Sequence, residues 1–155
     1  MKILLDADSC PKTARDLVLR RAAKLSMRLI FAANHQIQAE CESADGVFRA
    51  EMEICPLKDN SADDRIVELA VSGDLAITRD VPLAKRLIDK NVSVIDDRGR
   101  VFTLDNINEM LSLRNFTVGL AESGLGIERT ANYGKKEIKQ FADSLDRILT
   151  KMNRK

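Results

Sequence analysis

The sequence has few of the residues that stack on nucleic-acid bases or cross-link secreted domains. It contains no tryptophan, and aromatic residues make up only 4% of the chain. An extended stacking platform for a single strand is therefore not expected. The three cysteines (Cys10, Cys41 and Cys55) are an odd number without CxxC spacing, and the single histidine, His35, completes no zinc-binding set. This pattern excludes a disulfide framework and favours reduced thiols in the cytoplasm.

The chain also lacks a strong net charge and a long apolar run. Its 25 basic and 24 acidic side chains give a formal net charge of +1, so no global field predicts a polyanionic partner. Residues 100–155 hold ten of the basic and seven of the acidic side chains, an excess that a solvated helix face explains. No apolar run approaches the length of a membrane span, and no signal peptide precedes the first strand. We expect a cytoplasmic protein without membrane contact.

Short apolar strands alternate with amphipathic helices over the first hundred residues. The patterns predict strands over residues 2–7, 27–33, 47–54, 75–78 and 92–95. Helices are expected after Pro11, from the S-x-x-D capping box at 61–64, and over 83–88. This alternation indicates an α/β fold with a mainly parallel sheet of about five strands.

The pattern becomes helical after Gly99. Two short helices are predicted over 105–114 and 115–122, and a loop with three glycines over 124–134. A longer helix then carries one apolar stripe, made of Ile138, Phe141, Ala142, Leu145, Ile148, Leu149 and Met152. The stripe packs on the sheet in the simpler interpretation, and forms a homodimer seam in the alternative. We expect a single domain, with a core over 1–100 and a helical extension over 101–155.

Acidic residues gather where the predicted parallel strands end, the edge at which such sheets place their chemistry. Asp6 and Asp8 end the first strand and share one face if the strand continues that far. Asp63 and Asp64 begin a helix, and Asp80 follows the fourth strand. If the first and fourth strands are neighbours, these acids converge.

Clustered carboxylates repel and raise each other's pKa, and a bound cation relieves the repulsion. Oxygen ligands favour Mg²⁺ or Mn²⁺ over zinc. We therefore predict that all five acids are metal ligands, and that four of them are also catalytic: Asp6, Asp8, Asp63 and Asp80. Helix capping explains every one of the five except Asp6 equally well. Asp6 follows three apolar residues, and burying it unpaired would cost several kcal/mol.

Five further residues near this edge are candidate substrate ligands: Ser9, Lys12, Asn34, Thr78 and Arg79. The side chain of Thr78 faces the same way as that of Asp80, two residues later, and the two cations suit phosphate groups. Ordinary turn, strand or solvated-helix positions are the alternative for each of them.

Four segments together resemble one known family: D-A-D-S-C-P at 6–11, A-A-N-H at 32–35, the stretch 62–84 that contains G-D-L-A-I-T-R-D-V-P-L-A, and R-G-R-V-F-T at 98–103. This is the YaiI/YqxD family of uncharacterised bacterial proteins, which is regarded as related to PIN-like domains. The resemblance covers nearly the whole chain. It implies a three-layer fold and metal-dependent cleavage of nucleic acid, with RNA favoured over DNA as the substrate.

The resemblance also implies residue roles. Asp6 matches the acid that ends the first PIN strand, Asp63 the acid that opens the D-D-x-I helix, and Asp80 the acid of the T-x-D motif. PIN nucleases usually have a further acid on a helix in the middle of the chain, for which this sequence has no convincing equivalent. Asp8 or Asp64 is the candidate to fill that gap.

Two other functions stay open. The near-neutral charge and the missing acid favour a non-catalytic PIN-like module that binds nucleic acid or protein. The run L-L-D-A-D-S-C also resembles the D-x-D motif of haloacid-dehalogenase-like phosphatases, in which Asp6 would be the nucleophile. Such enzymes need an acid pair after a later strand, whereas Gly73 and Asp74 precede theirs.

Overall fold

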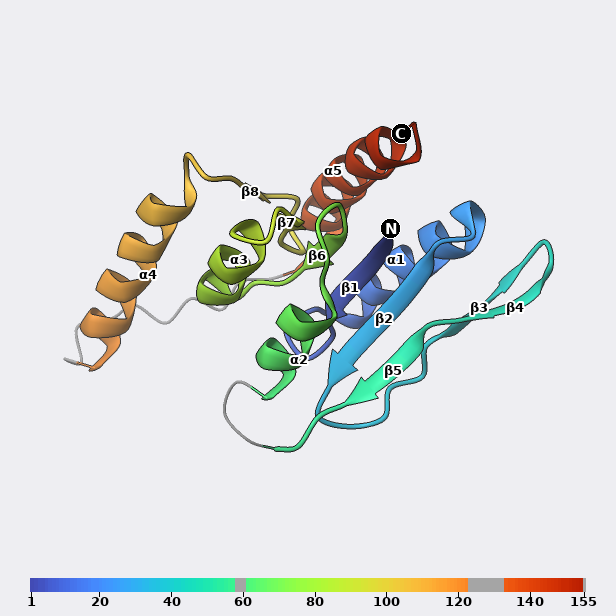
Figure 1. The fold of residues 1–155 in the computed structure, drawn as a ribbon, viewed down its shortest axis with the longest axis horizontal. Helices are drawn as coiled ribbons and strands as arrows, with labels where there is room; N and C mark the ends of the chain where they lie inside the picture. Colours follow the sequence, from blue (N-terminus) through green and yellow to red (C-terminus); the bar gives the residue numbers. More distant parts are fainter. Residues whose placement is uncertain (58–60, 123–132, 155) are drawn as a thin grey trace.

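The computed structural model describes residues 1–57, 61–122 and 133–154 (Figure 1). Three helices are interspersed with the strands of the first hundred residues, as the sequence predicts, but four strands follow one another between the first helix and the second. The elements in chain order are β1 (Lys2–Asp6), α1 (Lys12–Leu25), β2 (Arg28–Ala33), β3 (Glu40–Ser43), β4 (Gly46–Arg49), β5 (Glu51–Ile54), α2 (Ser61–Leu69), β6 (Leu75–Ile77), α3 (Val81–Ile88), β7 (Ser93–Ile95), β8 (Val101–Phe102), α4 (Ile107–Glu122) and α5 (Lys135–Asn153).

The main sheet has six strands in the order β5-β2-β1-β6-β7-β8. All neighbours are parallel except β7 and β8, and a separate antiparallel hairpin joins β3 to β4. The sheet extends from β1 to β2 and β5 on one side and to β6 and β7 on the other. The strand order therefore reverses between β1 and β6. In such sheets a crevice for ligands forms at the carboxyl ends of the two strands that flank this point.

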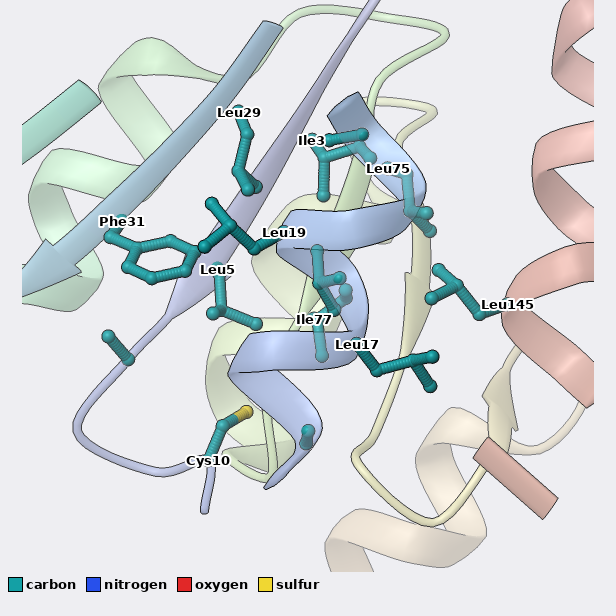
Figure 2. Packing of buried hydrophobic residues seen from close by; sticks show 14 of the residues in the cluster. Ile3, Leu5, Cys10, Leu17, Leu19, Leu29, Phe31, Leu75, Ile77 and Leu145 are labelled. Carbon is teal, nitrogen blue, oxygen red and sulfur yellow. The ribbon is translucent and has the colours of Figure 1, made fainter. Parts of the chain in front are cut away.

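Alternating side chains along β1 divide the core into two clusters, one on each face of the sheet. Ile3 and Leu5 pack with α1 and α5, whereas Leu4 packs with α2, α3 and the start of α4. Figure 2 shows the first cluster, with Leu19 of α1 and Leu145 of α5 beside the strand residues. The fold is therefore a three-layer α/β arrangement, and both faces of the central strands are covered, as parallel sheets require.

Helix α5 belongs to this core. Its stripe residues Phe141, Leu145 and Leu149 are buried in the cluster that includes β1, and each such burial contributes about 1.5–3 kcal/mol. The apolar stripe thus packs on the sheet, as in the simpler interpretation, and this part of α5 is covered by its own chain. Over the parts of the chain that the structure describes, no helix is long and apolar enough to span a bilayer.

The structure differs from the sequence prediction in several elements. The strand predicted over 47–54 is two strands, because β4 pairs with β3 whereas β5 pairs with β2. The break falls at Ala50, whose N–H donates to the Ala39 carbonyl oxygen. The helices predicted over 105–114 and 115–122 are one helix, α4. Strands β3 and β8 were not predicted, and most of the predicted loop over 124–134 lies outside the described residues.

Candidate functional site

Asp6 ends β1 at the point where the strand order reverses, and its side chain is buried. Only 6% of the residue is exposed. Thr78, just after β6, donates its hydroxyl proton to Asp6 Oδ2 at 2.9 Å, and the Ser9 hydroxyl donates to the Asp6 carbonyl oxygen at 3.1 Å. Burial raises the pKa of Asp6, and the bond from Thr78 opposes that rise. Asp6, the one acid of the five for which the sequence offers no capping role, is thus a buried carboxyl group that accepts a hydrogen bond from Thr78.

Asp80 is fixed beside this pair. Its backbone N–H donates to Thr78 Oγ1 at 3.0 Å, and its Oδ1 accepts from the Leu83 N–H at 3.0 Å. Asp80 is therefore the N-cap of α3, as the capping alternative predicts. It also faces the other acids, because its charge raises the pKa of both Asp6 and Asp63. Capping and membership of the acidic group are compatible here.

Asp63 joins the group from α2, in the first turn of that helix. Its pKa is raised to about 6, first by burial and then by the charges of Asp80 and Asp6, while Arg86 opposes the rise. A hydrogen bond to the Asp80 carboxyl group contributes further. Three acids from three separate elements thus converge. We call Asp6, Asp63 and Asp80 the acidic triad.

Asp8 lies at the rim of the acidic triad. The strand ends at Asp6, so Asp8 does not continue the alternation that the sequence suggests and lies in the following turn. Its Oδ2 accepts from the Asn34 N–H at 3.0 Å, and its Oδ1 lies 3.7 Å from Nδ1 of His35. Asp8 still raises the pKa of Asp6 through its charge. Asn34 therefore takes part through its backbone in positioning an acid at this rim.

Two of the predicted site residues, Asp64 and Lys12, form ion pairs with residues outside the acidic triad. Asp64 points to Arg86, with Oδ1 accepting from a guanidinium nitrogen at 2.9 Å, and its side chain is 59% exposed. Lys12 pairs with Asp16 one helical turn away on the exposed face of α1. The Lys12 contact lies away from the acidic triad, whereas Arg86 is also close enough to Asp63 to oppose the rise of its pKa.

Arg79 borders the acidic triad and is held by an acid that sequence reasoning did not select. Its backbone N–H donates to Ser9 Oγ at 3.5 Å, and its Nε donates to both carboxylate oxygens of Asp97 at 2.8 Å. Asp97 is completely buried, whereas the Arg79 side chain is 45% exposed. The hydroxyl of Tyr133 donates to the Asp97 carbonyl oxygen. The position of Asp97 after the fifth predicted strand was the only signal for it in the sequence.

The chemistry of the acidic triad can be compared with the needs of a divalent ion. Within the described part of the chain, no three His, Cys, Asp or Glu side chains are arranged to hold an ion together. Magnesium, however, usually keeps several waters and binds through one or two carboxylates. The hydrogen bonds to Thr78 and Leu83 engage one oxygen each of Asp6 and Asp80. The residues therefore fit an ion held by one or two carboxylates, and not a preformed three-carboxylate site.

Comparison with known proteins identifies relatives along the whole chain. A protein family described as "Uncharacterized BCR, YaiI/YqxD family" matches residues 4–151. A UPF0178 protein of Treponema denticola is 46% identical over 151 residues, covering 97% of this chain and 93% of the relative. UPF0178 proteins of Treponema pallidum and Pseudomonas fluorescens are 44% and 40% identical over 154 residues. These two alignments cover 99% of this chain and 84% and 99% of the respective relatives.

No solved structure matches this chain. The family therefore rests on the sequence comparisons, each of which covers almost the whole chain. The chain belongs to the YaiI/YqxD family of bacterial proteins, whose members include the UPF0178 proteins.

Proposed function

We propose that the acidic triad binds Mg²⁺ or Mn²⁺ and that the protein hydrolyses phosphodiester bonds in nucleic acid, with RNA as the favoured substrate. One observation carries this proposal. Asp6, Asp63 and Asp80 come from three elements and meet at the reversal of strand order, where the charge of Asp80 raises the pKa of Asp6 and the charges of Asp80 and Asp6 raise the pKa of Asp63. Such mutual repulsion costs stability, and a divalent cation would offset it. The preference for RNA rests on the PIN-like resemblance alone.

Each residue then has a defined part. A bound divalent ion would supply activation of water and stabilisation of charge on the leaving oxygen. Asp6 and Asp80 would hold the ion, since Thr78 and the α3 cap fix their orientation. Asp63 faces both of them and would orient the attacking water. Arg79, anchored by Asp97, would contact a phosphate of the substrate.

A non-catalytic binding module is the second candidate. It is favoured because, among the described residues, no group of three His, Cys, Asp or Glu side chains is arranged to hold a metal ion. The haloacid-dehalogenase-like reaction has less support. Its acid pair would have to lie near Asp6, yet Asp74 is at the amino edge of the sheet, where it pairs with Lys2 at 2.6 Å.

The test is a titration with Mg²⁺ and Mn²⁺ that follows thermal unfolding of the wild type, Asp6→Asn and Asp45→Asn. A ligand at ten times its Kd stabilises by about 1.4 kcal/mol, which raises the Tm of a chain of this size by about 3–6 °C. Wild type and Asp45→Asn should show this rise and Asp6→Asn should not. Asp45 is a fair control because it lies in the exposed turn before Gly46, where Asn is equally tolerated.

Cleavage is then measured on end-labelled single-stranded RNA and DNA with the ion that binds. Metal-dependent products from wild type and Asp45→Asn, but not from Asp6→Asn, would support the nuclease. If neither ion raises the Tm of the wild type at concentrations up to about 10 mM, and no oligonucleotide is cleaved, the proposal is wrong. The binding module would then be the better account.

A further inference from the structure

A continuous path of hydrogen bonds leads from the acidic triad to the start of α5. The Ser9 hydroxyl bonds the Asp6 carbonyl oxygen and accepts from the Arg79 N–H. Arg79 pairs with Asp97, and the Asp97 carbonyl oxygen accepts from the hydroxyl of Tyr133, two residues before α5 begins. Figure 1 shows α5 (red) beginning close to β7. The first turns of α5 therefore lie near the edge of the sheet that holds the acids.

Helix α5 runs away from this edge toward the opposite one. Its last turn places Met152 in a cavity of about 440 Å³ with Met1 and Ser93, at the amino ends of β1 and β7. The two ends of this one helix are thus near opposite edges of the sheet. Replacing basic residues at one end or at the other therefore distinguishes an effect of cations near the acids from an effect of the net charge of the protein.

The end near the acids is rich in exposed basic side chains. Lys135, Lys136 and Lys139 are exposed in the first two turns, and none of them forms a salt bridge with a described residue. Arg98 lies close enough to lower the pKa of Glu137 through its charge. We call this set the basic patch; its members are Arg79, Arg98, Lys135, Lys136 and Lys139.

The acids around the basic patch are already engaged. Asp97 is paired with Arg79, and Glu137 accepts from the Gly134 N–H at 3.0 Å. Asp96 accepts from the backbone N–H groups of its own loop, those of Arg98 and Arg100. The five cations of the patch outnumber these three acids, so the patch keeps a net positive charge. Lys135 and Lys139 are also one turn apart, a spacing at which like charges destabilise a helix.

We propose that the basic patch binds the phosphate backbone of a single strand of nucleic acid and directs it across the acidic triad. The inference rests on the proposed function only for what happens at the triad; binding at the patch needs no metal. The carboxylates of the acidic triad repel a polyanion, so a strand must be held by cations beside them. Tyr133 is the aromatic residue next to Arg79, and a lone ring favours binding without base preference.

The test compares two triple variants of the full-length chain. One is Lys135→Gln/Lys136→Gln/Lys139→Gln in the basic patch. The matched control is Arg147→Gln/Lys151→Gln/Arg154→Gln, which removes the same charge from exposed positions at the other end of α5. Glutamine is a good helix former, so both variants should fold, and far-ultraviolet circular dichroism checks this. Binding is followed by fluorescence anisotropy of labelled oligo(U) and oligo(dT) of about 20 nucleotides, with chelator present to prevent cleavage.

Wild type should bind with an affinity that falls with salt, and the control should bind within about threefold of it. Three lost phosphate contacts would weaken binding about 100-fold near 0.1 M salt, because each contact contributes about 0.7 to the slope of log K against log salt. The slope of the patch variant should therefore fall by about 2. Equal weakening in both variants, no weakening in either, or no binding by wild type would overturn the inference.

Failure of this inference and failure of the proposed function are distinguishable. If wild type cleaves RNA with metal but the patch variant binds normally, the nuclease proposal stands and the patch proposal falls. If nothing is cleaved but the patch variant alone loses binding, the surface is supported and the catalytic proposal falls.

Discussion

Replacing Asp63 with Asn should stabilise the protein at neutral pH, although it removes an acid from the start of a helix. In the folded chain the pKa of Asp63 is raised from 3.8 to about 6, mainly by burial and by the charges of Asp80 and Asp6. A difference of this size corresponds to about 3 kcal/mol of unfavourable free energy once the group is charged. Asp63 is only half-buried, so screening by solvent reduces this to about 1–2 kcal/mol.

The sign of the pH dependence follows from the direction of the shift. Because the folded pKa is above the unfolded one, folded Asp63 keeps its proton while the unfolded chain has already lost it. The wild type therefore loses stability as the pH rises from about 4 to about 6, and the penalty is constant above that range. Asn carries no charge in either state, so the variant avoids this loss. Below about pH 4 its advantage should disappear.

One cost partly offsets the gain. Removing a negative charge from the first turn of α2 costs about 0.3–1 kcal/mol. The net expectation for Asp63→Asn near pH 7.5 is thus a stabilisation of up to about 1.7 kcal/mol, or a rise in Tm of up to about 7 °C. Asp64→Asn removes the same helix charge but breaks the pair with Arg86, and should lower stability by up to about 1 kcal/mol.

Urea unfolding of wild type, Asp63→Asn and Asp64→Asn, in chelator at about pH 4.5 and pH 7.5, measures all of these differences. The reasoning is refuted if Asp63→Asn is as destabilised as Asp64→Asn at the higher pH. It is also refuted if the gain is the same at both pH values, because the effect would then not come from ionisation of the Asp63 carboxyl group.

Two further substitutions test the supports of the site. Thr78→Val removes the hydroxyl donor to the buried Asp6 and should lower the free energy of unfolding in urea by about 1–3 kcal/mol. Thr13→Val on the exposed face of α1 should change it little. Equal effects of the two substitutions would show that the bond to Asp6 is unimportant. Gly99→Ala should destabilise more than Gly73→Ala in thermal unfolding, since both glycines have positive φ but only at Gly99 would the new Cβ overlap the backbone of α5. Equal losses at the two glycines would mean that the loop and α5 do not pack as described.

Much of the fold was readable because its signals are local. The alternation of apolar runs and helical stripes depends on a few consecutive residues, so strands such as β1, β2 and β6 and helices such as α1 were predicted. The failures were cases in which pairing partners decide. One apolar run over 47–54 forms β4 with one partner and β5 with another, and the two-residue strand β8 exists only because β7 binds it.

The same division holds for the site. The sequence by itself determined that Asp6 is exceptional, because a charge directly after a buried strand must be paired, protonated or bound to a cation. It also determined which acids stand at strand ends and helix starts. Only the tertiary structure decided which of them meet. Neighbouring residues Asp63 and Asp64 have the same local context, yet one faces Asp80 and the other Arg86. Their partners come from other segments of the chain, and long-range pairing is not encoded in the residues of one helical turn.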